Sequence, residues 1–167
     1  MDPMMNNLTQ SNTELIEISR HNFQNINLTY PLKNRYLKTL NNIKNGYRAI
    51  AIVRDNEVIG DVWYTTSKNP TRTSVHPDVK WLGIDFGEKD VYAWDMLIKP
   101  TERGNSISIS LMNGAMHILR KKGFEKLYGY YWADNIPALW MHRMLRFKEL
   151  KRLKVHRFLY VKFIKQK

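Results

Sequence analysis

The chain of 167 residues contains no cysteine, and this absence removes several chemistries at once. Without thiols there can be no disulfide bond, no cysteine-ligated zinc or iron–sulfur cluster, and no cysteine nucleophile. The five histidines show no metal-ligand spacing, so we also expect no bound metal. Any group transfer by this protein must therefore proceed without a cysteine-bound intermediate.

Long apolar runs are lacking as well. No stretch approaches the roughly 20 apolar residues of a membrane-spanning helix. The first twelve residues, MDPMMNNLTQSN, have neither the basic nor the apolar part of a signal peptide. We therefore expect a cytoplasmic protein that makes no membrane contact. Residues 1–12 are predicted to be a disordered segment, and residues 13–167 have a length that suits one domain.

Acidic residues are few. Lys and Arg number 27 against 15 Asp and Glu, which gives a net charge of +12. From Met141 to Lys167, ten Lys or Arg accompany a single acid, Glu149. Such a balance suits an anionic partner, which is nucleic acid, an anionic membrane or a phosphorylated cofactor. The basic residues of the tail alternate with apolar ones, as in a strand with one solvated face. A nucleic-acid-binding module is therefore kept only as an alternative.

Hydrophobic periodicity predicts an α+β fold, a sheet with helices on its faces. The predicted strands cover 14–19, 47–54, 57–66, 91–99, 126–131 and one or two segments within 149–164. The predicted helices cover 33–45, a segment from 107 to a stop at Gly123, and a segment opened by Asn135-Ile136-Pro137. In the first of these helices, Tyr36, Leu37, Leu40 and Ile43 recur at helical spacing. Residues 67–89 are predicted to be a long irregular connection.

The most informative segment is the turn over 98–108, between a strand and a helix. Its small residues allow main-chain groups to approach one another closely, and the first N–H groups of the following helix have no partner within that helix. These donors and the helix dipole favour an anion such as a pyrophosphate. Arg103 adds a positive charge beside them.

This turn resembles motif A of the GNAT superfamily of N-acyltransferases, V-x-P-x-x-[QR]-G-x-G-[IL]-[GA]. Pro100, Arg103, Gly104 and Ile107 match it, and Ile98 is a close substitute. Residues 135–147 resemble motif B, N-x-x-A-x-x-L-Y-x-x-L-G-F, with matches at Asn135, Ala138, Leu145 and Phe147 and a close substitute at Met141. The resemblance is strongest over 91–147. It implies an α/β/α sandwich whose central mixed, mostly antiparallel sheet has a splay between two central strands and helices on both faces.

The resemblance also implies an activity. Acetyl-CoA or another acyl-CoA is the donor, an amine is the acceptor, and transfer is direct. The acceptor amine belongs to a small molecule, an amino-sugar nucleotide, a protein N-terminus or a lysine. A second alternative is a protein of this fold that binds acyl-CoA without transferring the acyl group. The oligomeric state is open, with a homodimer as one arrangement.

The family's cofactor contacts carry over residue by residue. By this resemblance, the pyrophosphate binds the backbone N–H groups around Arg103, Gly104, Asn105, Ser106, Ile107 and Ser108. By the same resemblance, the pantetheine arm pairs with the main chain of Met96, Leu97 and Ile98, and Asn135 and Ala138 border the arm. Ser106 and Ser108 replace positions that usually carry Gly and Gly or Ala; serine is small enough for close approach but adopts positive φ less readily than glycine does.

The acid and the base are less defined by the motifs. His142 stands where many family members carry a tyrosine that protonates the leaving thiolate, and protonated histidine is a stronger acid than tyrosine. Packing on the helix's apolar face is its alternative role, and Tyr128, Tyr130 and Tyr131 are alternative acids. Asp95, an acid within an apolar strand, is the first candidate for the general base, with a structural hydrogen bond as its alternative. Asp61, then Glu88 and Asp90, are further candidate bases, and bulk water is another.

Overall fold

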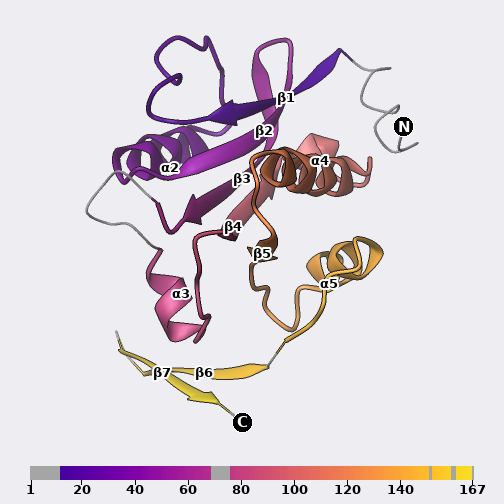
Figure 1. Ribbon diagram of the computed structural model, residues 1–167. Helices are drawn as coiled ribbons and strands as arrows, with labels where there is room; N and C mark the ends of the chain where they lie inside the picture. The colour runs from indigo at the N-terminus through magenta and orange to yellow at the C-terminus, as the bar shows by residue number, and fades with distance from the viewer. Residues whose placement is uncertain (1–11, 69–75, 151, 159–160, 167) are drawn as a thin grey trace.

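The computed structural model describes residues 12–68, 76–150, 152–158 and 161–166 (Figure 1). Its strands are β1 (Thr13–Ile18), β2 (Arg48–Arg54), β3 (Glu57–Thr66), β4 (Asp90–Ile98), β5 (Lys126–Tyr128), β6 (Leu153–Phe158) and β7 (Val161–Gln166). Its helices are α2 (Lys33–Lys44), α3 (Pro77–Trp81), the 3-10 turn η1 (Pro100–Glu102), α4 (Ile107–Lys121) and α5 (Ile136–Met144). The predicted disordered segment, 1–12, lies outside the described residues except for Asn12. Within the described ranges, no helix has the length and apolar character needed to cross a membrane.

Five strands form one open sheet in the order β1-β2-β3-β4-β5. The first three pairings are antiparallel, and only β4 and β5 run parallel. The sheet is therefore mixed and mostly antiparallel, as predicted. Strands β6 and β7 form a separate antiparallel pair, which Figure 1 shows at the opposite end of the molecule from β1.

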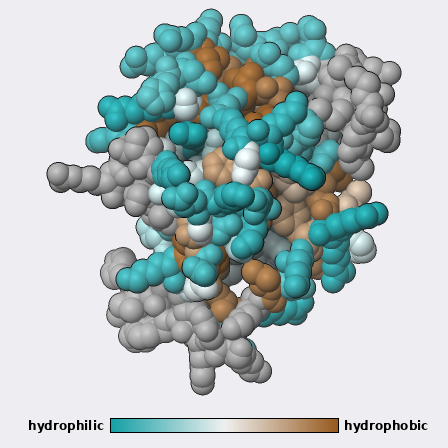
Figure 2. All heavy atoms as spheres, in the orientation of Figure 1, coloured by the Kyte–Doolittle hydropathy of each residue, from teal (hydrophilic) through white to brown (hydrophobic). Residues whose placement is uncertain are grey.

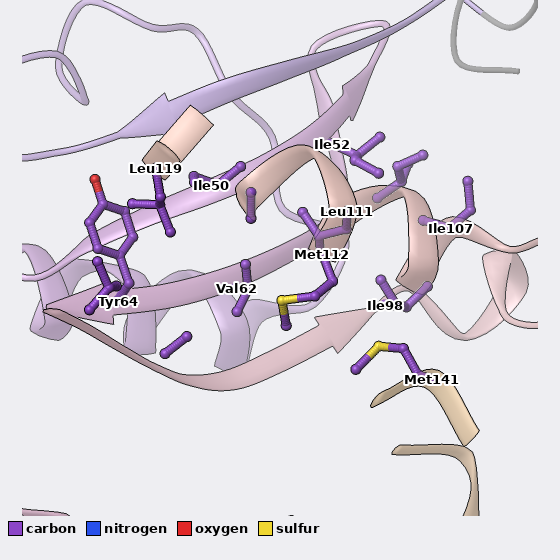
Figure 3. Close-up of a cluster of buried hydrophobic side chains, with 14 residues drawn as sticks. Ile50, Ile52, Val62, Tyr64, Ile98, Ile107, Leu111, Met112, Leu119 and Met141 are labelled. Carbon is purple, nitrogen blue, oxygen red and sulfur yellow. The ribbon is translucent and has the colours of Figure 1, made fainter. Parts of the chain in front are cut away.

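Helices cover both faces of the sheet because its middle strands are apolar on both sides. In β2, Ile50 and Ile52 join the core beneath α4, whereas Ala49, Ala51 and Val53 join the core beneath α2. This period of two is the natural alternation of side chains along a strand. The α4-side core extends to Leu111, Leu119 and Met141 (Figure 3). The predicted α/β/α arrangement is confirmed.

Helix α2 lies where the sequence predicts it, but its apolar residues mostly point away from the sheet. Leu37 is 53% exposed and Tyr36 and Leu40 are also exposed, whereas Ile43 is buried. The inward face carries Arg35 and other polar side chains. The reason is a buried acid on β3, Asp61, which requires a cation from the covering helix.

Two further segments differ from the predictions. Strand β5 ends at Tyr128, three residues earlier than expected. The segment predicted to be irregular contains α3, which begins with Pro77 after a cap by the His76 side chain. Asp78 secures α3, because it accepts hydrogen bonds from Trp81 Nε1 at 2.6 Å and from the Tyr92 hydroxyl at 3.0 Å.

Candidate active site

Strands β4 and β5 separate after a short pairing. They are paired only from Asp90 opposite Lys126 to Tyr92 opposite Tyr128. A Cβ added at Gly129 would lie 3.0 Å from the Ala93 carbonyl oxygen, so glycine permits the close approach at which the strands part. Strand β4 continues to Ile98 along β3. Among the described residues, its other edge has no strand partner beyond Tyr92, which is the predicted splay.

A β-bulge lies in the part of β4 that pairs with β3 but not with β5. The register with β3 shifts between the pair Asp61–Leu97 and the pair Trp63–Trp94, so two residues of β4 oppose one of β3. Asp95 sits in the bulge with φ of +53°, in the left-handed region that non-glycine residues seldom adopt. Met96, Leu97 and Ile98, the predicted pantetheine contacts, follow the bulge directly.

A cluster of charged side chains holds the bulge from the α2 side. The Arg35 guanidinium donates to Asp61 through Nε and Nη2, at 2.7 to 3.1 Å. Its Nη1 donates to Asp95 Oδ2 at 2.6 Å, and its Nη2 donates to the Asp95 main-chain oxygen at 2.6 Å. Lys38 Nζ lies 2.9 Å from the same Oδ2. Burial raises the pKa of Asp61, and the Arg35 guanidinium acts against that rise.

The loop between β4 and α4 leads the chain from this strand to a helix N-terminus. Gly104 (φ +88°) and Ser106 (φ +58°) both adopt left-handed conformations, and the side chain of the N-cap residue Ser106 makes no capping hydrogen bond to α4 within the described structure. Arg103 to Ser106 are exposed. Ile107 anchors the start of α4 in the same core as Ile98 (Figure 3). The predicted pyrophosphate residues therefore lie together just beyond the end of β4, and the first four of them are exposed.

Helix α5 packs its inner face beside this end of β4. Met141 is buried in the core that contains Ile98 and Met112 (Figure 3). Asn135 caps the helix, because its side-chain oxygen accepts a hydrogen bond from the Ala138 N–H at 3.2 Å. The half-buried face predicted from Ala138, Met141, His142 and Leu145 is confirmed.

His142 is fixed by one hydrogen bond and two rings. Its Nδ1 lies 2.6 Å from the Ala138 carbonyl oxygen, and a carbonyl can only accept, so Nδ1 carries a proton. The imidazole stacks on Tyr131 with 4.9 Å between ring centroids and meets Phe147 edge-on at 5.0 Å. In the neutral ring the remaining nitrogen, Nε2, is then an acceptor. Only the protonated ring can donate from Nε2.

The structure thus brings most predicted donor-binding residues to one place and separates the candidate bases from it. The donor strand, the start of α4 and the inner face of α5 meet in one core, while Asp95 is bound by side chains of α2 on the other face. Asp61 is 1% exposed and held by Arg35. Glu88 and Asp90 lie at the opposite end of β4. The described residues contain no group of His, Asp and Glu arranged to hold a metal ion.

Arg35 and Lys38 are the two site residues that the sequence did not indicate. A signal existed, because Arg35, Thr39 and Asn42 recur at helical spacing and all three are buried. However, a polar stripe at that spacing is the ordinary pattern of a solvated helix face. Only the position of Asp61 on the neighbouring strand distinguishes the two cases.

Known proteins share this architecture. The chain is similar to the aminoglycoside N-acetyltransferase AAC(6')-Iy in complex with a CoA-based bisubstrate analogue, with a TM-score of 0.59 and 13% identity over 89% of this chain and 99% of that one. It is also similar to a ribosomal-protein-alanine N-acetyltransferase from Brucella melitensis biovar Abortus 2308, with a TM-score of 0.56 and 12% identity over 87% of this chain and 99% of that one. At such identities the likeness concerns the fold.

Sequence comparison gives two further matches. A mycothiol acetyltransferase of Clavibacter sepedonicus is 28% identical over 69 residues, which are 41% of this chain and 22% of that relative. The chain therefore aligns with about a fifth of the relative's length. The family model described as acetyltransferase (GNAT) family matches residues 12–147, most of the chain. With the splayed sheet, the bulged β4 and the exposed loop before α4 in place, this chain belongs to the GNAT acetyltransferase family.

Proposed function

We propose that this protein transfers an acetyl group from acetyl-CoA directly to a primary amine, without a covalent acyl-enzyme. The free edge of β4, which leads from the splay toward the N-terminus of α4, carries the proposal. An extended chain of amides can pair with such an edge as an added strand, and phosphates suit a helix N-terminus. Solved structures of similar fold hold CoA or a CoA-based analogue, which supports the same donor here.

The donor contacts follow the course of the chain. The main chain of Met96–Ile98 would pair with the pantetheine arm, and Asn135 and Ala138 would border that arm from α5. The main chain of Arg103–Ser108, of which Arg103 to Ser106 are exposed residues, would hold the pyrophosphate, with the Arg103 guanidinium as a further cation. Because these residues lie on a strand end and on two helix starts that share one core, their relative positions are fixed before the donor arrives.

Asp95 is the proposed general base. Both of its cationic partners, Arg35 and Lys38, bind Oδ2, and its side chain is 23% exposed, so Oδ1 is the oxygen proposed to take the proton. Oδ1 would take a proton from the acceptor ammonium, directly or through water. The freed nitrogen lone pair would then attack the thioester carbonyl carbon, giving a tetrahedral oxyanion.

His142 is the proposed general acid. When the oxyanion collapses, the C–S bond breaks and the sulfur leaves as a thiolate. The imidazolium form of His142 would donate its Nε2 proton to that sulfur, while Nδ1–H stays bonded to the Ala138 carbonyl oxygen. Acid and base would then act from opposite faces of the sheet, one on each side of the scissile bond.

The acceptor is proposed at the level of a primary amine. The similar structures include an enzyme named for aminoglycosides and one named for the alanine of a ribosomal protein, so amines of very different size are compatible with this fold. A panel should therefore contain aminoglycosides, amino-sugar nucleotides, peptides with free N-termini and lysine-containing peptides.

Two measurements test the proposal. Calorimetric titration with acetyl-CoA should give saturable binding, and the absence of heat at millimolar ligand would reject donor binding altogether. Release of the CoA thiol should then depend on one class of amine in the panel. Binding of acetyl-CoA without thiol release across the panel would instead favour the alternative of an acyl-CoA-binding protein without transferase activity.

A further inference from the structure

Arg35 connects three elements at the bulge of β4. The side chain comes from α2, binds Asp61 on β3 through Nε and Nη2, and binds Asp95 on β4 through Nη1 and Nη2. It is only 7% exposed, and Asp61 is 1% exposed. Charge-assisted hydrogen bonds in such a shielded place are strong and directional.

One of these bonds goes to the main chain of the bulge itself. A bulge interrupts the regular ladder of a sheet, and the left-handed φ of Asp95 is unfavourable for a residue with a side chain. The Asp95 carbonyl oxygen receives a hydrogen bond from Arg35 Nη2, and the Asp95 carboxylate receives one from Nη1. Arg35 therefore stabilises the one residue of β4 whose conformation the strand does not favour.

The conformation of Asp95 determines which main-chain N–H and C=O groups the next residues expose at the free edge of β4. A shift of one residue along a strand exchanges the two directions of its side chains and main-chain groups. Met96, Leu97 and Ile98 lie immediately after the bulge, with Leu97 and Ile98 paired to β3 and the opposite edge without a strand partner in the described chain. If the bulge moved or relaxed, that edge would present different N–H and C=O groups.

We propose that Arg35 is a positioning residue for the acyl donor: it holds the Asp95 bulge so that the Met96–Ile98 edge presents the main-chain groups that bind the pantetheine arm. Asp61 is the fixed point of this clamp, because its buried carboxylate holds the guanidinium from β3. The inference rests on the proposed function, since it assumes that this edge binds acyl-CoA.

The test compares Arg35→Met with Ile43→Ala. Both positions are buried on α2, but Ile43 lies eight residues further along the helix and packs in the α2-side hydrophobic core. Arg35→Met should raise the Kd and the KM for acetyl-CoA at least tenfold while kcat falls less. Arg35→Lys, which keeps the charge but not the planar fork, should give intermediate values. Ile43→Ala should lower the melting temperature with Kd within twofold of the unaltered protein.

A second variant guards against loss of folding. Arg35→Met alone leaves two carboxylates without their buried cation, whereas Arg35→Met combined with Asp61→Leu removes the buried charge pair together. Hydrogen exchange of the peptide spanning 91–99 then reports on the bulge without any ligand. We expect faster exchange at 95–98 in this double variant and none of that change in Ile43→Ala.

The outcomes are separable. Unchanged exchange over 95–98, or a Kd within twofold of the unaltered protein in the double variant, would overturn the role of Arg35. If the unaltered protein itself binds no acetyl-CoA, the proposed function fails, and the exchange measurement still shows whether Arg35 holds the bulge.

Discussion

Ser106 takes up a backbone conformation that its own chemistry disfavours. Its φ of +58° lies at the turn into α4, where the family motif has glycine. Ser106→Gly should therefore raise the free energy of unfolding by about 1 kcal/mol, because glycine has no Cβ to clash in the left-handed region. Denaturant unfolding measures this. Ser108→Gly is the matched control: Ser108 lies in the first turn of α4, so the change should lower stability by about 0.5 kcal/mol. Shifts of the same sign would contradict the explanation.

His142 allows a sharper test of chemistry against packing. Phenylalanine keeps a ring between Tyr131 and Phe147 but has no proton to give. If His142 protonates the leaving thiolate, His142→Phe should lower kcat by a factor on the order of 10² or more, with the Kd for acetyl-CoA within twofold. Assays of CoA thiol release measure kcat, and calorimetric titration measures the Kd for acetyl-CoA. Equal turnover in the variant would leave His142 with a packing role only.

The sequence could predict the loop between β4 and α4 because its residues are neighbours along the chain and form a local motif. It could not resolve the role of Asp95 in the same way. Arg35 is hydrogen-bonded to Asp95, which is 60 positions away in the sequence, and to Asp61, which is 26 positions away. A carboxylate in an apolar strand requires a cation, but no periodicity tells which one. The choice depends on which helix lies over which strand.

At the scale of elements, α5 depends on its cap. Asn135 accepts the Ala138 N–H, and the helix has only nine residues, so its first turn is a large part of it. Asn135→Ala should cost about 1 kcal/mol of unfolding free energy, whereas Asn135→Asp keeps the acceptor oxygen and should cost much less. Thermal and denaturant unfolding of both variants test this. If Asp destabilises as much as Ala does, the cap is not the source of the loss.

Helices with a clear hydrophobic period could be predicted from the sequence, but the face that each helix buries could not always be predicted. Helix α4 buries Ile107, Leu111, Ala115 and Leu119, as its pattern predicts. Helix α2 has an equally clear apolar spacing, yet exposes Tyr36, Leu37 and Leu40. Periodicity gives the axis of a helix and the angle between its faces. It does not say which face a neighbouring strand will attract when that strand carries a buried charge.

At the scale of the whole molecule, buried phenols predict alkaline unfolding. Burial raises the pKa of Tyr30 to about 12 and raises the pKa of Tyr64 and Tyr92 further. Below the ordinary phenol pKa of about 10, the unfolded and folded chains hold the same phenolic protons, so this contribution to stability is fully present. Above it the unfolded chain ionises first, and stability should fall by roughly 1.4 kcal/mol per tyrosine for each pH unit until the folded pKa is reached.

Denaturant unfolding between pH 8 and pH 11 measures this slope. Tyr30→Phe removes one of the three ionisations, so the free energy of unfolding of that variant should fall less steeply above pH 10. A stability that stays level up to pH 11 would show that these phenols are not held protonated by the fold.

Composition and length predicted a single domain without thiol chemistry, but they identified the binding partner only as an anion. The absence of cysteine and the length of one domain are compatible with an α/β/α sandwich whose proposed acyl transfer uses no protein thiol. The face seen in Figure 2 is largely hydrophilic, with apolar atoms in small groups, as the charge content predicts. The net charge of +12 indicated an anionic partner without choosing one. Most of the C-terminal basic residues lie on and around β6 and β7, away from the motif that matches the family, so composition alone did not locate the site.

The excess positive charge should nevertheless act on the donor. CoA is polyanionic, and a basic protein attracts it over about one Debye length, which falls from roughly 10 Å at 0.1 M salt to roughly 3 Å at 1 M. The Kd for acetyl-CoA should therefore rise steadily with salt. Arg103 lies in the loop four residues before α4, whereas Lys121 is the last residue of α4, about 20 Å from the helix start at a rise of 1.5 Å per residue. Arg103→Gln and Lys121→Gln remove the same charge, but only Arg103→Gln should flatten the salt dependence appreciably. Equal slopes for the two variants would mean that the net charge attracts the donor without a contact at the loop before α4.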